Sequence, residues 1–284
     1  MITTMTKDGR KTPIASVGER LSSQLRRIQG RPLTFDMDVW EGLSYGQHPE
    51  QSLDVWELND LAPRAGWPAV LFLHGGGWVS GSRDSFRVQA PLLARQGILV
   101  ASASYRLGEA GQWPAQLDDV IAAIDRLLGL QINPKRIGLW GVSAGGHLAL
   151  CAAQQLGPER IRAVVTIGAP TDLPALAQSE RSWPELEVVF GRDHLDEASP
   201  ALNSTGLPPV LALHGTRDKA VPFSQAERLA TQHSNVEILP VKGADHLLRM
   251  PPGVGKRAQG QARKWLAQQV ADHKRGSKWK IRRS

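Results

Sequence analysis

Short runs of apolar residues recur along the chain, and each is separated from the next by an amphipathic helical pattern. The runs cover residues 69–75, 98–105, 136–141, 162–170, 209–215 and 236–241. Continuous apolar runs of this length are typical of strands that are buried on both faces. Helical patterns occupy residues 85–97, 114–130, a stretch after Ser143, 224–234 and about 256–272. This alternation predicts an α/β fold, with a mostly parallel central sheet and helices on both of its faces.

Three further segments complete the predicted organisation. Residues 35–43 and 52–58 alternate between apolar and polar side chains, which predicts an antiparallel pair at the N-terminal edge of the sheet. Residues 171–207 are too long for a simple crossover, so we expect a small helical cap insertion over the edge where open α/β sheets bind ligands. We therefore divide the chain into a polar N-terminal arm (1–35), a main domain (36–272) and a basic C-terminal tail (273–284).

The formal net charge of +7 is concentrated at the two ends of the chain. Residues 1–31 carry seven Lys or Arg against two acidic residues, and residues 274–284 carry six Lys or Arg and no acid. The residues between them carry a small net negative charge. A basic tail can contact nucleic acid or anionic lipid, but the pattern favours a solvated, poorly ordered terminus. We expect no obligatory nucleic-acid partner.

The composition is typical of a soluble globular protein, with 41% hydrophobic and 21% charged residues. No stretch has the roughly 18 apolar residues that predict a membrane span. The N-terminus lacks the apolar core of a secretory signal, and the single cysteine, Cys151, excludes an internal disulfide. These features predict a cytoplasmic location. They do not indicate the oligomeric state.

The segment LWGVSAGGHLAL (139–150) places Ser143 where a predicted strand gives way to a helix. Gly141 and Gly145 complete the pattern G-x-S-x-G, in which a sharp turn forces the serine into an unfavourable backbone conformation. Small neighbours allow this turn to form. The strain is tolerated where the turn presents a nucleophilic hydroxyl, so Ser143 is a candidate nucleophile.

A second motif, His74-Gly-Gly-Gly-Trp78, follows the first central strand. Three consecutive glycines are entropically costly, so their N–H groups are expected to face a ligand. Donors placed in this way stabilise the oxyanion of acyl transfer, and the N–H of Ala144 would add another. We predict an oxyanion hole from the glycine run, residues 75–77, and Ala144, and the sequence leaves open which two glycines donate. Trp78 is a candidate for the substrate pocket, with core packing as the alternative.

A nucleophilic serine needs a base, and the base needs an orienting acid. His246 and Asp218 each follow a predicted strand of the same sheet, so the three side chains can meet at one edge. Asp172 and Asp245 are rival acids, although Asp245 is adjacent to His246 in sequence and poorly placed to orient it. No motif with metal-ligand spacing occurs, so we expect no metal and no cofactor.

Together these motifs resemble the α/β-hydrolase esterases and lipases that carry HGGGW, near the hormone-sensitive-lipase-like carboxylesterases. The resemblance spans roughly residues 37–270. Some blocks are more similar to acetylxylan and feruloyl esterases and to kynurenine formamidase, notably LDVW (53–56) and PPVLALHG (208–215). The resemblance implies Ser143 as nucleophile, His246 as general base and then acid, and Asp218 as orienting acid. It also implies oxyanion donors from Gly76, Gly77 and Ala144.

The resemblance also indicates the type of substrate. The short polar N-terminal part cannot form the large helical cap of hormone-sensitive-lipase-like enzymes. We therefore expect small or short-chain acyl esters, cleaved through an acyl-enzyme intermediate. An arylformamidase or another small amide hydrolase would use the same residues. A ligand-binding scaffold without catalysis is a third interpretation, which the complete triad disfavours.

Overall fold

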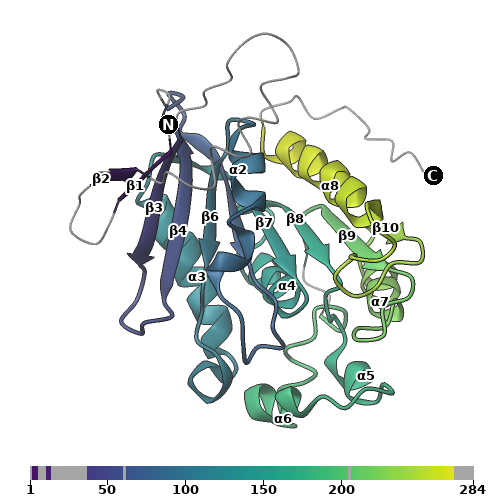
Figure 1. The fold of residues 1–284 in the computed structure, drawn as a ribbon. Coiled ribbons are helices and arrows are strands. Elements are labelled where there is room, and N and C mark those ends of the chain that lie inside the picture. The colour runs from purple at the N-terminus through teal and green to yellow at the C-terminus, as the bar shows by residue number, and fades with distance from the viewer. Residues whose placement is uncertain (1, 6–10, 14–36, 60–61, 204–205, 272–284) are drawn as a thin grey trace.

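The computed structural model describes residues 2–5, 11–13, 37–59, 62–203 and 206–271. These residues contain a ten-stranded sheet in the order β10-β9-β8-β7-β5-β6-β4-β3-β1-β2 (Figure 1). Its strands are β1 (Ile2–Met5), β2 (Lys11–Pro13), β3 (Met37–Ser44), β4 (Ser52–Leu58), β5 (Trp67–Leu73), β6 (Leu99–Ala103), β7 (Ile132–Val142), β8 (Ile161–Ile167), β9 (Val210–Gly215) and β10 (Val236–Val241).

The sheet has a parallel part and an antiparallel edge, as the sequence predicts. Strands β5 to β10 pair with one another in parallel. Strand β4 is antiparallel to both β3 and β6. All seven residues of β5 and all five of β6 are buried, which explains their continuous apolar sequences.

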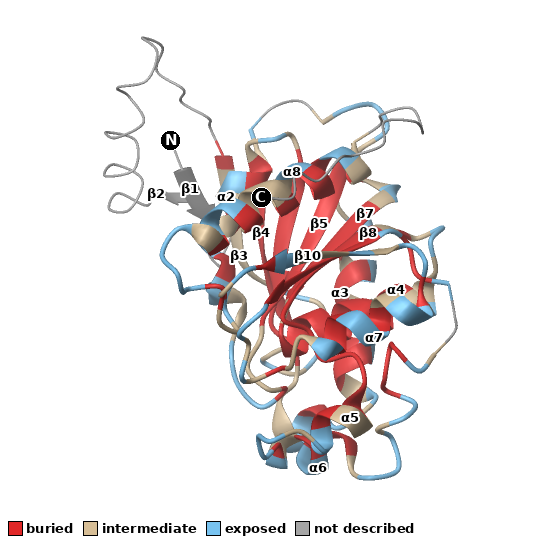
Figure 2. Ribbon diagram, turned by 90° about the vertical axis from the view of Figure 1, so that its right-hand side faces the viewer, coloured by how far each residue is buried: buried red, intermediate tan, exposed pale blue. Residues whose placement is uncertain are grey.

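Helices cover both faces of the sheet. Along β5, Leu71 and Leu73 belong to one hydrophobic cluster with residues of the helices α3 (Ala115–Leu128), α4 (Ala144–Leu156) and α7 (Ser224–Gln232). Val70 and Phe72 belong to another cluster, with residues of α2 (Gln89–Ala94) and α8 (Val254–Val270). The period of two along the strand thus supplies both layers, and Figure 2 shows the buried strands between them. The helices and 3₁₀ turns are η1 (Arg83–Phe86), α2 (Gln89–Ala94), η2 (Gly108–Gly111), α3 (Ala115–Leu128), α4 (Ala144–Leu156), α5 (Leu173–Ala177), α6 (Pro184–Phe190), α7 (Ser224–Gln232) and α8 (Val254–Val270).

The segments predicted to flank or interrupt the main domain are described to different extents. Most of the arm, residues 1–35, lies outside the described residues, but β1 pairs in parallel with β3 and β2 pairs with β1. The predicted insertion, residues 171–207, contains the short helices α5 and α6 (Figure 1). The basic tail, residues 273–284, lies outside the described residues. Among the helices that the structure describes, none combines the length and apolarity needed to span a membrane.

Candidate active site

Ser143 lies at the sharp turn between β7 and α4. Its backbone has φ 51° and ψ −121°, a conformation that non-glycine residues rarely adopt. A Cβ atom at Gly145 would lie 2.2 Å from the carbonyl oxygen of Leu73, and one at Gly141 would lie 2.2 Å from the carbonyl oxygen of Gly145. Only glycine fits at these two positions. The small residues of the motif therefore permit the close approach of three backbone segments.

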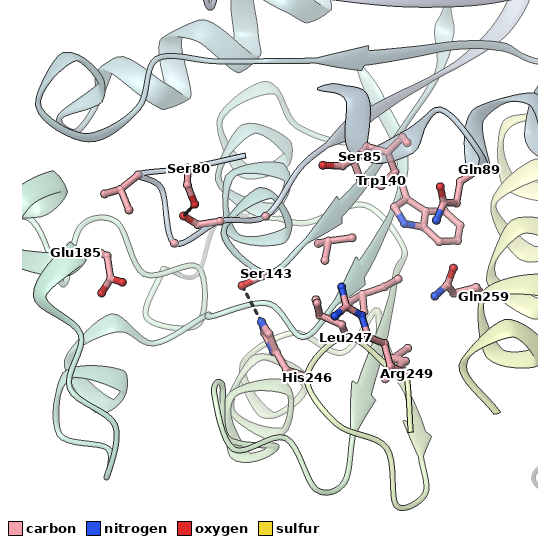
Figure 3. Close-up of a pocket in the computed structure, with 18 of the residues that line it drawn as sticks. Ser80, Ser85, Gln89, Trp140, Ser143, Glu185, His246, Leu247, Arg249 and Gln259 are labelled. Atoms are coloured by element: carbon pink, nitrogen blue, oxygen red, sulfur yellow. Dashed lines mark hydrogen bonds between the residues drawn. The ribbon is translucent and has the colours of Figure 1, made fainter. Parts of the chain in front are cut away.

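The structure brings together three side chains that are far apart in the sequence. Asp218 follows β9 and His246 follows β10, so both lie at the edge of the sheet where β7 ends at Ser143. His246 Nε2 is 3.0 Å from Ser143 Oγ (Figure 3), and His246 Nδ1 is 2.7 Å from Asp218 Oδ2. Both distances are those of hydrogen bonds. The imidazole is therefore held between a carboxylate and a hydroxyl.

The carboxylate of Asp218 is buried and held by several donors. Its Oδ1 accepts hydrogen bonds from the backbone N–H groups of Ala220 (2.9 Å) and Val221 (2.8 Å). Burial acts to raise the pKa of Asp218, but the hydrogen bonds from His214, His246 and Val221 outweigh it and lower the pKa to about 2. The group is therefore a carboxylate at neutral pH, and its charge favours a proton on the Nδ1 atom of His246.

Neither rival acid contacts His246 in the structure. Asp172 caps α5 by accepting from the N–H of Ala175, and its other oxygen pairs with Arg228 at 3.0 Å. Asp245 accepts hydrogen bonds from the backbone N–H of Arg249 and of the residue after it. Both carboxylates therefore support local backbone structure, and Asp218 is the acid that the fold places beside the imidazole.

The glycine-rich loop after β5 passes directly beside Ser143. A Cβ atom at Gly75 would lie 3.2 Å from the Cβ atom of Ser143. Gly76 and Gly77 have φ values of 129° and 60°, which favour glycine. Within the described residues, the amide nitrogens of Gly76 and Gly77 have no hydrogen-bond partner. Ala144 is the first residue of α4, so its N–H is also free of an intrahelical acceptor.

The orientation of this loop is fixed from two sides. The carbonyl oxygen of Gly76 accepts from the N–H of Ser80 (3.0 Å) and from its hydroxyl (2.8 Å). Because the peptide is trans, this turns the N–H of Gly77 in the opposite direction. The hydroxyl of Tyr105 donates to the carbonyl of His74 at 2.7 Å, and the two rings stack 4.3 Å apart. Tyr105 therefore supports this loop.

Trp78 is not part of the pocket wall, which corrects the sequence-based prediction. Its side chain is fully buried, its indole N–H donates to His147 Nδ1 at 3.2 Å, and its ring packs edge-on against Phe190. Trp78 has φ 63°, and this backbone conformation turns the indole into the core. Trp183, which belongs to the predicted insertion (171–207), lines the pocket beside Ser143.

The pocket that contains Ser143 and His246 has a volume of about 840 Å³. Figure 3 shows Glu185 on one side of these two residues and Arg249 on the other. Apolar side chains also contribute to its wall, among them Trp140, Ile167 and Leu248. A cavity of this size and mixed character can hold a small organic molecule.

A family model described as BD-FAE matches residues 58–233, more than half of the chain. The chain belongs to the BD-FAE family. This match includes the glycine loop, Ser143 and Asp218, whereas His246 lies beyond its end. The BD-FAE chain has the α/β-hydrolase fold, with the mostly parallel sheet and antiparallel edge described above.

Three similar proteins illustrate this assignment. Esterase LipC of Mycobacterium tuberculosis is 34% identical over 238 residues, which are 71% of this chain and 58% of LipC. Arylacetamide deacetylase of Bos taurus is 34% identical over 142 residues, or 46% of this chain and 34% of that protein. A propionate-bound esterase of Thermogutta terrifontis, Est2, superposes with a TM-score of 0.65 at 26% identity, covering 80% of this chain and 93% of Est2.

The chain spans about half the length of the curated relatives that it matches.

Two contributors to the candidate site were not assigned a role from the sequence. His214 lies 3.4 Å from Asp218 through its Nε2 atom, which also contacts the carbonyl of Val221 at 2.9 Å. Glu185 lies in the pocket wall close to Gly77. An i, i+4 spacing from His214 to Asp218 is visible in the sequence, but only the fold places Glu185.

Among the described residues, no group of three or more His, Cys, Asp or Glu side chains could hold a metal ion.

Cys151 and His147 both lie buried in α4. Burial raises the pKa of the Cys151 thiol, so it is protonated at neutral pH. These two residues belong to the core.

Proposed function

We propose that this chain is a serine hydrolase that cleaves small carboxylic esters through an acyl-enzyme intermediate. The observation that carries the proposal is the continuous contact from Asp218 through His246 to Ser143, with distances of 2.7 Å and 3.0 Å. Nucleophile, base and orienting acid within hydrogen-bond reach of one another are what acyl transfer requires.

In the proposed mechanism, His246 Nε2 accepts the proton of Ser143 as its Oγ attacks the ester carbonyl. The negative charge that develops on the carbonyl oxygen is stabilised by the N–H groups of Gly76, Gly77 and Ala144. The tetrahedral intermediate collapses as His246 gives the proton to the departing alcohol. A water molecule then attacks the acyl group, with the same histidine as base, and releases the acid and the free serine.

The size of the substrate follows from the limited cover over the site. We propose that residues 171–207 act as the cap, since Trp183 and Glu185 of this segment line the pocket. Its helices α5 and α6 have five and seven residues, which is little material to enclose a long acyl chain. The similarity to a propionate-bound esterase supports the preference for short acyl groups. The cytoplasmic location also stays a proposal, based on the single cysteine.

Amide hydrolysis is the second candidate, and one observation favours it. Arylacetamide deacetylase is 34% identical to this chain over 142 residues, and the proposed triad can attack an amide carbonyl by the same route. A formamide substrate would require His246 to protonate an amine as it leaves.

The proposed function is tested by rates on 4-nitrophenyl esters from acetate to palmitate, with formylkynurenine as the amide. We expect the highest kcat/KM for acetate to butyrate, and a loss of at least about 10³-fold in Ser143→Ala, because the attacking oxygen is removed. Wild-type activity in the alanine variant would contradict the proposal. Formylkynurenine as the best substrate by orders of magnitude would support the amide alternative.

A further inference from the structure

The two ends of the pocket differ in charge. Glu185 lies on the side of α6, where Arg181 approaches its carboxylate at 4.0 Å and stacks over the ring of Trp183. Arg249 and Lys256 line the opposite side, next to α8 (Figure 3 labels Arg249). The charges of Glu185 and Arg181 therefore offset each other at the α6 end, whereas two cations line the α8 end.

The cations at the α8 end have no acidic partner within the described part of the chain. No carboxylate lies within ion-pair distance of the side chain of Arg249 or Lys256. Asp245 is near Arg249 in sequence, but it accepts from the backbone N–H of that residue. Two like charges in one wall repel each other, and an anion between them removes that repulsion.

Other donors surround the same end. Helix α8 has 17 residues, and its first turn carries no acidic residue and no side-chain cap. The positive end of its dipole therefore adds to the charge of Lys256, which lies in that turn. Gln89 and Gln259 also line the wall. Each amide can donate through its NH₂ group.

We propose that the α8 end of the pocket binds a carboxylate on the ester substrate, with Arg249 and Lys256 as the residues that select it. The substrate class is then an ester of which either the acyl part or the alcohol part carries a second, ionised carboxyl group. This inference rests on the proposed function. At the α6 end the charges of Glu185 and Arg181 offset each other, so the excess positive charge of the α8 end sets the direction in which the substrate lies.

The test compares two matched pairs of esters. One pair places the charge on the acyl part, 4-nitrophenyl hydrogen succinate against 4-nitrophenyl butyrate. The other places it on the alcohol part, 4-acetoxybenzoate against its methyl ester. The readout is the ratio of kcat/KM for the anionic and the neutral ester, which cancels general effects of a substitution on the triad.

We expect the wild type to prefer the anionic ester of one pair by about tenfold, the effect of a partly exposed contact between an anion and two cations. Arg249→Gln and Lys256→Gln should each reduce this ratio about three- to fivefold, and added salt should reduce it in the wild type. Arg257→Gln is the matched control. It removes the same charge from the next residue of α8, which does not line the pocket, and should retain the preference.

A wild-type ratio of one or below in both pairs would overturn the inference while leaving the esterase intact. Equal ratios in Arg249→Gln, Lys256→Gln and Arg257→Gln would also overturn it, because the selectivity would then have another source. Absence of Ser143-dependent hydrolysis of all four esters would overturn the proposed function, and this inference with it. The outcomes therefore distinguish a failure of specificity from a failure of the reaction.

Discussion

Replacement of Asp218 by asparagine separates the role of its charge from that of its shape. Oδ1 of Asp218 accepts from the N–H groups of Ala220 and Val221, and the carbonyl oxygen of an asparagine would keep those contacts. The NH₂ group would then face His246 Nδ1, where the carboxylate now lies at 2.7 Å. His246 would have to accept at Nδ1 and carry its proton on Nε2, towards Ser143. The base would be in the wrong tautomer.

The expected loss is large because the reaction has no alternative base. We expect kcat/KM on 4-nitrophenyl acetate to fall about 10³- to 10⁴-fold in Asp218→Asn, which is about 4–5 kcal/mol of transition-state stabilisation. The unfolding free energy should change far less, since the packing and the backbone contacts remain. Urea denaturation followed by tryptophan fluorescence measures the unfolding free energy separately from the activity.

The rival acids provide the controls for this prediction. Asp172 pairs with Arg228 and caps α5, and Asp245 accepts backbone N–H groups, so neither affects the imidazole directly. Asp172→Asn and Asp245→Asn should retain kcat/KM within about tenfold. If Asp218→Asn stayed within tenfold of the wild type while either control lost activity, the assignment of the orienting acid would be refuted.

Three further predictions concern stability. Gly145→Ala should lower the unfolding free energy by about 3 kcal/mol, because the new Cβ would clash with a β5 carbonyl oxygen at 2.2 Å. Gly206→Ala, which has open space around it, should change the unfolding free energy by less than about 1 kcal/mol. Equal effects of the two substitutions in urea denaturation would contradict this prediction. Burial lowers the pKa of His147 from 6.5 to about 4, against a hydrogen bond to Ala198 that raises it, so the unfolded chain binds the extra proton. The neutral His147 side chain therefore contributes on the order of 3 kcal/mol to the unfolding free energy above pH 6.5, and this contribution is lost as the pH falls to 4. A urea midpoint that stays constant over that pH range would contradict this prediction. Trp78→Phe removes a buried hydrogen bond and should cost about 1–2 kcal/mol with KM unchanged; a raised KM with unchanged stability would return Trp78 to the pocket.

The sequence predicts the elements of this fold well because their periods are distinct. Strand β5 is apolar at every position, and the helix after Ser143 begins where glycines end the strand. The edge of the sheet is less predictable. Strand β1 has only four residues, two of them threonines, so its parallel pairing with β3 depends on contacts that no local pattern encodes.

The candidate site divides in the same way. Ser143, Asp218 and His246 each follow a strand of one parallel sheet, so topology alone predicts that they meet. Side chains whose position depends on packing were harder to predict. Trp78 follows the glycines directly, yet its positive φ directs it into the core, and Arg249 enters the pocket only because the chain turns there between β10 and α8.

The central claim is that the hydroxyl of Ser143 is the activated nucleophile. A fluorophosphonate probe reacts covalently with such a serine, and peptide mapping by mass spectrometry locates the adduct. We predict one equivalent of label, on the peptide that contains Ser143, and its loss in Ser143→Ala and after acid unfolding. Label on another serine at the same rate, or retained labelling of the alanine variant, would contradict the account.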